Sequence, residues 1–259
     1  MNAEMNTTIG DKSDGRAGYR AGLMCVLVMM VAMLGMIVAS AKADHGPQTW
    51  DAANRSVVVV EPTWPGFARP GFGAPPGVAP AGTGVVYPIG QMATAPGSYI
   101  LTAAHVVVKA ERIEVTDSSG VRLEARLHGL DLARDIAVLH VEASLEPVVL
   151  AEVRALVGMH VCALVNAFGL GTSFTCGVVS AVQLQNVGFN EIEDFIQTDA
   201  AVNPGASGGA LVLADGTFVG MLDGIFTKEA DIDAGVNFAV SLDLIKESLA
   251  AMQAAGIRF

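Results

Sequence analysis

Ser207 is the residue of this sequence whose surroundings most suggest nucleophilic chemistry. It stands in the glycine-dense run Gly205-Ala206-Ser207-Gly208-Gly209. Glycine permits positive φ and a close approach of the backbone to other groups. Such a turn can expose the hydroxyl while neighbouring N–H groups point at one spot, which a serine nucleophile and its oxyanion hole require. Because a short run of this kind is more often an ordinary turn, the prediction depends on a base and an orienting carboxylate elsewhere.

A histidine and an aspartate upstream are the candidates for these two roles. His105 follows the apolar run 99–104, whose small residues would let other groups come close, and Asp135 begins the apolar run 136–139. Alone, the histidine would more often be a buried structural residue and the aspartate a turn residue. Together with Ser207 they could form a triad, in which the imidazole accepts the serine proton and the carboxylate orients the imidazole.

Short strands are the elements that would position these residues. Runs rich in β-branched and aromatic residues, bounded by Gly, Asp and Ser, recur along the chain without a comparably strong amphipathic helix between them. Ser241 is expected to cap one amphipathic helix, 241–254. The pattern predicts an all-β barrel or sandwich with a C-terminal helix. The expected strands are 56–60, 83–87, 99–102, 112–116, 121–127, 136–141, 160–165, 174–182, 195–198, 210–213, 217–222 and 236–240.

The N-terminal part predicts export. Residues 1–20 form a polar, cytoplasmic leader, and the apolar segment 21–39 is near the minimum length for a membrane span. Arg16 and Arg20 on its N-terminal side predict that the rest of the chain is exported. The small-x-small sequence ending at Ala43 indicates a signal peptidase site, so segment 21–43 is either a cleaved signal peptide or a membrane anchor. The protein is then periplasmic, either anchored in the inner membrane or soluble after cleavage.

Composition restricts the partners and cofactors. Acidic residues outnumber basic ones, 26 against 15, so no basic surface for nucleic acid is expected. The three cysteines show no zinc spacing, and we expect neither a metal nor a cofactor. Cys162 and Cys176 should lie on two strands of one hairpin. A disulfide suits an exported protein, but two buried thiols are at least as consistent, since hairpin geometry rarely suits the bond.

Two further segments are expected to lack regular structure. Residues 44–56 are polar and are expected to form a linker. The proline- and glycine-rich segment 61–82 is expected to be a long exposed loop.

Taken together, the motifs resemble trypsin-like serine proteases of the HtrA/Deg type. Among them are Ile-Leu-Thr-Ala-Ala-His-Val-Val and Phe-Ile-Gln-Thr-Asp-Ala-Ala-Val-Asn-Pro-Gly-Ala-Ser-Gly-Gly-Ala-Leu-Val. The resemblance covers about residues 57–250 in the family's order. It implies two six-stranded antiparallel β-barrels, about 57–145 and 155–240, within a protease domain 57–259. The matching motifs are 82–85, 100–107, 135–141, 168–171, 176–181, 195–212 and 235–240.

The resemblance also implies a function and a set of site residues. His105, Asp135 and Ser207 would be the triad of an endopeptidase that cleaves envelope or misfolded proteins through an acyl-enzyme. The N–H groups of Gly205 and Ser207 would form the oxyanion hole. The remaining residues implied by the resemblance bind substrate: Ala201 and Val202 line the primary specificity pocket, and Leu222, Asp223, Gly224 and Ile225 pair with the extended peptide. Since the pocket has no acid, a small or medium apolar side chain should precede the cleaved bond.

The chain departs from the family pattern at two positions. Ala206 replaces the Asn or Asp that usually precedes the serine, and Asp223 stands where relatives carry Ser or Thr. A second carboxylate near Asp135 would raise a pKa or disturb the triad, unless it points to solvent. These departures favour an alternative function, a catalytically weak or inactive module that binds extended peptides or scaffolds at the membrane.

Assembly is the last property that the resemblance touches. Because the sequence ends at Phe259, soon after the expected helix, we expect no peptide-binding PDZ domain. The resemblance further implies a homo-oligomer, a trimer. The expected partners of the protein are polypeptide substrates and, if segment 21–39 is not cleaved, the membrane.

Overall fold

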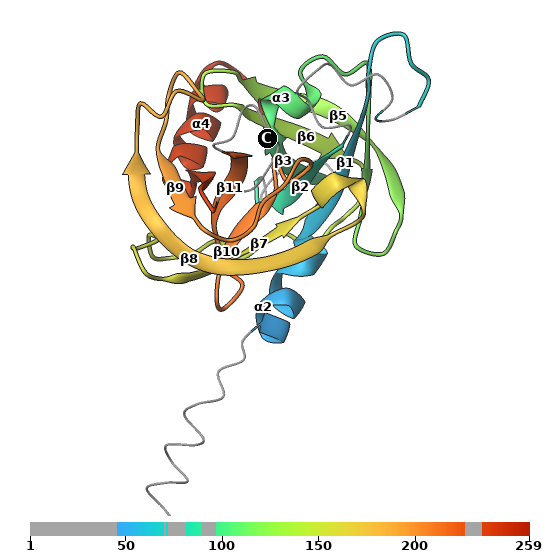
Figure 1. The fold of residues 1–259 in the computed structure, drawn as a ribbon. Helices are drawn as coiled ribbons and strands as arrows, with labels where there is room; N and C mark the ends of the chain where they lie inside the picture. Colours follow the sequence, from blue (N-terminus) through green and yellow to red (C-terminus); the bar gives the residue numbers. More distant parts are fainter. Residues whose placement is uncertain (1–45, 70, 72–80, 90–96, 226–234) are drawn as a thin grey trace, which may run out of the picture. The chain divides into compact units, whose positions relative to one another are not determined.

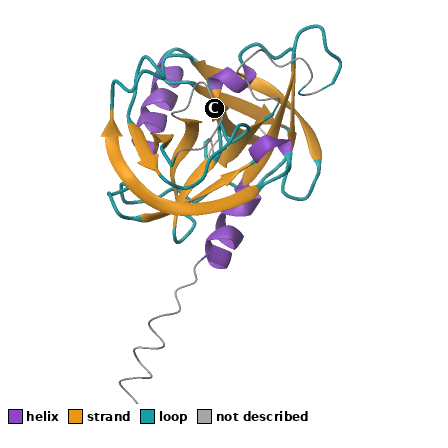
Figure 2. Ribbon diagram, viewed as in Figure 1, coloured by secondary structure: helices purple, strands orange, loops and turns teal. Residues whose placement is uncertain are grey.

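The computed structural model describes residues 46–69, 71, 81–89, 97–225 and 235–259 (Figure 1). The expected leader and apolar segment, residues 1–43, lie outside these described ranges, as does much of the expected loop 61–82. Within the described ranges, no helix has both the length and the apolar character needed to cross a membrane. Strands dominate this part of the chain (Figure 2).

The first barrel contains six antiparallel strands in the order β1-β2-β3-β6-β5-β4. Its buried residues are mostly β-branched residues and leucines, among them the fully buried Ile100, Leu101, Ile136 and Leu139. Such residues fit the half-buried, pleated surface of a strand. The strands are β1 (Val57–Thr63), β2 (Gly82–Tyr87), β3 (Ser98–Ala103), β4 (Arg112–Thr116), β5 (Arg122–Asp131) and β6 (Ile136–Val141).

The second barrel repeats this architecture in the order β10-β11-β12-β9-β8-β7. Phe195, Leu211 and Phe218 are fully buried in it. The prediction of two six-stranded antiparallel barrels is therefore confirmed. The strands are β7 (His160–Val165), β8 (Ser173–Leu184), β9 (Phe195–Thr198), β10 (Ala210–Leu213), β11 (Phe218–Ile225) and β12 (Asn237–Ser241).

The C-terminal helix α4 (Leu242–Ala254) connects the second barrel back to the first. Ser241 caps it as expected, accepting a hydrogen bond from the N–H of Leu244 at 3.1 Å. The helix, red in Figure 1, lies beside β11. Ser248 Oγ donates to Asp131 Oδ2 at 2.8 Å, at the end of β5 in the first barrel. The helix thus ties down the turn that leads to Asp135.

Where we expected a linker at 44–56, the structure has two helical segments, α2 (Gly46–Ala53) and η1 (Asn54–Ser56). Thr49 and Ala53, four residues apart, are buried, and the Thr49 hydroxyl donates to the carbonyl oxygen of Ala214. Residues with this spacing share one helix face. The polar composition hid a small buried face, and packing against the second barrel stabilises a helix too short to form alone.

Candidate active site

His105 and Asp135 meet at the edge of the first barrel. His105 lies in the one-turn helix α3 (Ala104–Val107) after β3, and Asp135 in the turn between β5 and β6. The N–H of His105 donates to Asp135 Oδ1 at 2.8 Å, and His105 Nδ1 lies 2.5 Å from Asp135 Oδ2. The N–H of Ala104 donates to the Asp135 carbonyl oxygen at 3.0 Å. Asp135 has φ of 53°, a conformation that Asp tolerates better than most residues.

The pair shifts the pKa of both its members. Burial by itself would lower the pKa of His105, but the hydrogen bond and charge of Asp135 raise it overall. Burial would raise the pKa of Asp135, but the hydrogen bond and charge of His105 lower it overall. Asp135 is only 9% exposed. The carboxylate therefore stabilises a protonated imidazole, which is what a general base becomes when it takes a proton.

Ser207 follows a tight turn in the second barrel. The N–H of Ala206 donates to the carbonyl oxygen of Asn203 at 3.0 Å, and Gly205 has φ of 98°. Proline at the second position and a positive φ at the third are the features of a type II turn. A Cβ atom at Gly205 would lie 2.4 Å from the carbonyl oxygen of Asn166. Both the backbone conformation and the lack of space require glycine here.

Two backbone N–H groups of this turn do not take part in the hydrogen bonds that hold the turn. The N–H groups of Ala206, Gly208 and Gly209 donate to backbone carbonyls. Within the described ranges, no such bond involves the N–H of Gly205 or Ser207. These are the two N–H groups that the family resemblance implies for the oxyanion hole.

The Ser207 hydroxyl donates to the backbone carbonyl of Asp223 at 3.1 Å. A hydroxyl has one proton to donate, so it is directed at Asp223 and not at His105 in this structure. The structure thus brings Ser207 to Asp223, and Asp223 to the His105–Asp135 pair. Attack by Ser207 requires its side chain to rotate toward the imidazole.

Asp223 is buried beside the pair, 6% exposed. One donor atom each from His105, Asp135 and Asp223 lies within 4.8 Å of the other two. Asn190 Nδ2 donates to Asp223 Oδ2 at 2.7 Å. Burial, followed by the charge of Asp135 and a hydrogen bond with it, raises the pKa of Asp223 well above its usual range. Of the two expectations for Asp223, the position near the triad is the one observed, and the solvent-facing one is wrong.

A histidine and two carboxyls form a donor set that Zn²⁺ accepts. Here His105 Nδ1 and Asp135 Oδ2 are already joined by a hydrogen bond. A metal ion bound to these two atoms would have to break their hydrogen bond. We therefore expect the proton between Nδ1 and Oδ2 to remain there, in place of a metal.

Thr83, in β2, holds the serine turn against the first barrel and was not assigned a role from the sequence. Its N–H donates to the Ser207 carbonyl oxygen at 2.9 Å, and its hydroxyl donates to the Gly205 carbonyl oxygen at 2.7 Å. The same hydroxyl accepts from the N–H of Asn166 at 2.8 Å. Its presence in the motif Gly82-Thr83-Gly84-Val85 was the available signal.

Glu193 organises the loop that carries Asn190, and neither residue was singled out from the sequence. Its carboxylate accepts hydrogen bonds from four successive backbone N–H groups, at 2.6 to 3.0 Å. Burial would raise the pKa of Glu193, but these bonds lower it overall. The N–H of Ile192 donates to the Ala133 carbonyl oxygen at 2.8 Å, which fastens the loop to the first barrel. The four donors are Val187, Gly188, Phe189 and Asn190.

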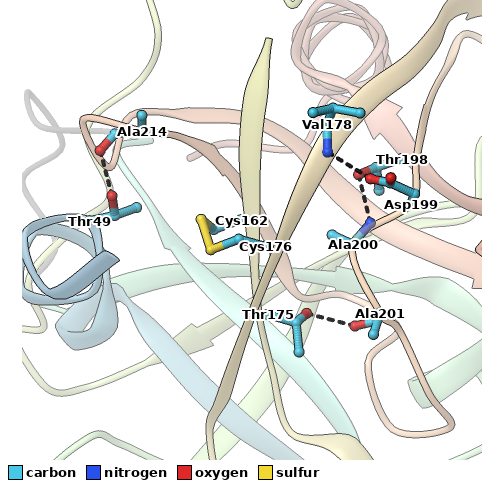
Figure 3. The surroundings of a disulfide bond; sticks show 10 residues. All are labelled: Thr49, Cys162, Thr175, Cys176, Val178, Thr198, Asp199, Ala200, Ala201 and Ala214. Carbon is cyan, nitrogen blue, oxygen red and sulfur yellow. Dashed lines mark hydrogen bonds between the residues drawn. A yellow bond between two sulfur atoms is a disulfide. The ribbon is translucent and has the colours of Figure 1, made fainter. Parts of the chain in front are cut away.

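Figure 3 shows the region expected to contain the specificity pocket. The Thr175 hydroxyl donates to the carbonyl oxygen of Ala201 at 2.7 Å. Ala201 itself is exposed, whereas Val202 is buried. The backbone at these positions is therefore held from β8.

The same view contains a disulfide between Cys162 and Cys176. The sequence left a disulfide and two free thiols open, and the structure has the disulfide. The two residues are directly paired across β7 and β8, with Cα atoms 4.0 Å apart. Direct opposition in an antiparallel pair brings side chains close enough for the bond.

The profile of the trypsin-like peptidase domain matches residues 82–221. Over 166 residues, 63% of this chain, the sequence is 36% identical to the periplasmic serine endoprotease DegP of Escherichia coli (strain K12). It is equally identical over the same length to the probable serine protease do-like of Buchnera aphidicola. These matches cover 35% and 34% of the relatives, so the chain spans about a third of their length.

Solved structures are similar as well. The HtrA-type protease AlgW with tripeptide has a TM-score of 0.67 and 32% identity, over 80% of this chain and 62% of that one. The serine endoprotease from Yersinia pestis has a TM-score of 0.64 and 29% identity, over 82% and 67% of the two chains.

Proposed function

The chain belongs to the family of trypsin-like peptidase domains, and from this premise we propose that it is a serine endopeptidase. Its triad is His105, Asp135 and Ser207. The observation that carries the proposal is the His105–Asp135 pair, locked by hydrogen bonds at 2.5 and 2.8 Å, beside a serine turn with two available amide donors. That combination serves acyl transfer to a serine.

The proposed reaction begins when the Ser207 hydroxyl rotates from the Asp223 carbonyl toward His105. Because Nδ1 of His105 is engaged by Asp135, Nε2 is the nitrogen that accepts the serine proton. Ser207 Oγ attacks the substrate carbonyl, and the N–H groups of Gly205 and Ser207 donate to the oxyanion, each contributing about 3 kcal/mol to the transition state. His105 then protonates the leaving amine, and water hydrolyses the acyl-enzyme.

An extended polypeptide is the proposed substrate. Strand β10 pairs with β11 only up to Met221, whereas β11 continues to Ile225. Leu222 exchanges backbone hydrogen bonds with Gly208 and Gly209, and among the described residues no strand pairs with that side of β11 after Leu222, which supports substrate addition along residues 223–225. Ala201 and Val202 offer no charge, so the residue before the cleaved bond is small or medium and apolar. Best cleavage after Arg or Lys in a peptide panel would contradict this preference.

We further propose export to the periplasm. The similar DegP protein is named a periplasmic endoprotease, and the Cys162–Cys176 disulfide suits an oxidising compartment. Segment 21–43 is proposed as the signal peptide or anchor. N-terminal sequencing of the mature protein with membrane fractionation separates the two, since cleavage after Ala43 gives a soluble protein. We also propose a homotrimer, as the family resemblance implies. Sedimentation analysis tests it by measuring whether the particle has the mass of three chains.

The direction of the Ser207 hydroxyl favours a second candidate, a protease-like module that binds extended peptides without cleaving them. Ala206 and Asp223 are further departures that favour it. A fluorophosphonate probe separates the two functions, because it reacts only with an activated serine. We expect the wild type to be labelled and Ser207→Ala to remain unlabelled. A folded wild type that is not labelled would contradict the endopeptidase function and favour the peptide-binding module.

A further inference from the structure

The side chain of Asp223 reaches the active site because of an irregularity in β11. The pairing of β11 with β12 shifts register between Leu222 and Gly224, so Asp223 is the extra residue of a β-bulge. Successive residues of a regular strand point to opposite faces, and the extra residue interrupts this alternation at the buried Asp223. A bulge can redirect a side chain in this way, and bulges are common beside active sites.

The redirected carboxyl creates an imbalance of charge. His105, Asp135 and Asp223 present donor atoms within 4.8 Å of one another, and the two carboxyl groups are almost fully buried. Two carboxylates facing one imidazole would leave a buried negative charge without compensation. Among the described residues, the charged groups that act on Asp223 are Asp135, from the turn between β5 and β6, and His105, from α3. One of the two carboxyls is therefore expected to remain protonated.

The hydrogen bonds decide which carboxyl keeps the proton. Asp135 accepts from two groups of His105, the backbone N–H and Nδ1. Among the described residues, the Asp223 carboxyl accepts from Asn190 Nδ2, at 2.7 Å, and from no second donor. Donors to a carboxylate favour its charged form, so Asp135 is the ionised member. Burial and the charge of Asp135 accordingly raise the pKa of Asp223.

Asn190 also sets the orientation of Asp223. Because Asp223 Oδ2 accepts from Asn190, Oδ1 is the oxygen left to carry the proton toward Asp135. The loop of Asn190 is held by the four backbone bonds to Glu193. The direction of the Asp223 carboxyl is thus set by Asn190, whose loop is itself held by hydrogen bonds to Glu193.

We propose that Asp223 is a positioning residue, a neutral carboxylic acid that donates a hydrogen bond to Asp135 and thereby orients it for His105. Asp223 adds a donor to the active site without adding a charge. Its consequence for catalysis rests on the proposed endopeptidase function, whereas its protonation state does not.

The protonation state is tested by an NMR titration of His105 in the Ser207→Ala background, with His105→Gln to identify the signal. Asp135→Asn and Asp223→Asn make the same chemical change at two neighbours of His105. Removing the charge of Asp135 should lower the pKa of His105 by about one unit or more. Asp223→Asn should change it by less than about 0.3 units, because a neutral acid contributes no charge. Equal lowering by both variants would overturn the proposal.

The donor role is tested by kinetics on two Asp223 variants of similar size. Asp223→Asn can donate an N–H to Asp135 and should keep kcat within about threefold of the wild type. Asp223→Leu cannot donate, and its kcat should fall about 10- to 100-fold with little change in KM. Thermal unfolding checks that both variants fold. A wild-type kcat in a folded Asp223→Leu, or an equal loss in Asp223→Asn, would overturn the proposal.

The two tests separate this proposal from the proposed function. The titration uses a protein without the serine and needs no activity. Absence of fluorophosphonate labelling in the wild type overturns the endopeptidase function and leaves the titration result standing. Equal pKa effects in a protein that labels overturn the role of Asp223 alone.

Discussion

The two barrels bring their parts of the active site in different states. In the first barrel, His105 and Asp135 are joined by two hydrogen bonds, and Ala104 adds a third to the Asp135 backbone. In the second barrel, the backbone of the serine turn is set, but the Ser207 hydroxyl donates to the Asp223 carbonyl. The base is ready in this structure, whereas the nucleophile still has to rotate.

This difference follows from what holds each group. His105 and Asp135 are positioned by each other, with the carboxylate bonded to both the ring and the backbone of the histidine. Ser207 is positioned through its backbone, by Thr83, and its hydroxyl is held away from His105 by the Asp223 carbonyl. If a backbone N–H of a bound substrate strand donates to the Asp223 carbonyl, it replaces the Ser207 hydroxyl there. The hydroxyl is then free to turn toward His105. We therefore expect activity to be most sensitive to side-chain changes at His105 and Asp135 in the first barrel. In the second barrel it should be most sensitive to changes in the backbone of the serine turn.

Asp135→Asn breaks the first half of this comparison and should have the largest effect. The amide cannot stabilise the imidazolium and favours the wrong tautomer, so kcat should fall about 10,000-fold with the fold retained. The measurement is kcat on a peptide substrate together with thermal unfolding. Asp131→Asn is the matched control, since Asp131 bonds Arg134 and Ser248 and should affect stability more than kcat. A loss below tenfold in Asp135→Asn would contradict the assigned triad.

Gly205→Ala breaks the second half through the backbone. The added Cβ would lie 2.4 Å from the Asn166 carbonyl oxygen and displace an oxyanion donor. We expect kcat to fall about 100- to 1,000-fold, the effect of losing one such donor. Gly171→Ala is the control, because Gly171 has the same φ of 98° with no atom within 4 Å of the added Cβ. Equal losses in both variants would mean that backbone strain alone is responsible.

Thr83→Val tests the link between the barrels. It removes the hydroxyl partner of the Gly205 carbonyl and the Asn166 N–H, and both groups lie in buried surroundings. We expect about 2 to 4 kcal/mol of destabilisation in urea unfolding, together with a lower kcat. Thr102→Val is the control, because it removes one hydrogen bond, to the Thr83 carbonyl. It should lower the free energy of unfolding by about 1 to 2 kcal/mol and leave kcat nearly unchanged. An unchanged kcat in Thr83→Val would show that the serine turn does not depend on the first barrel.

Asp223→Asn sharpens the comparison through the pH dependence of stability. The folded pKa of Asp223 is raised, so its favourable contribution is complete below the unfolded pKa and is lost as pH rises toward the folded one. Between these two pKa values, the free energy of unfolding of the wild type should fall by up to about 1.4 kcal/mol per pH unit relative to that of the variant. Urea unfolding at pH 4 and pH 6 measures this difference. The same difference at both pH values would indicate an ionised Asp223.

The regular strands were predictable from residue types alone. β4, β6, β7, β9 and β10 have the expected bounds, because each is a short alternating or apolar run that ends at turn residues. The errors lie at irregularities. β8 continues past its expected end through Gln183, which has φ of 56°, and β11 continues through the bulge at Asp223. A bulge depends on the partner strand, and a periodic pattern in one strand does not contain it.

The supporting residues of the site were less visible in the sequence than the triad candidates. Thr83 is 122 positions from Gly205, and its role exists only once the two barrels meet. Asn190 and Glu193 lie in a loop whose composition resembles that of any other polar turn. The functional types His, Asp and Ser were recognisable by their motifs, whereas their partners act through distances that no local pattern encodes.

The sequence by itself determined the chemical groups, the order in which they occur, and the two β-rich halves that carry them, because strand periodicity and turn residues are local properties. Only the tertiary structure decided that Cys162 and Cys176 pair, that the Ser207 hydroxyl is held by the Asp223 carbonyl, and that Asp223 lies buried beside Asp135. These contacts arise from strand register and from the closure of the barrels against each other. Both are decided by packing across the whole fold, which brings together residues far apart in the chain.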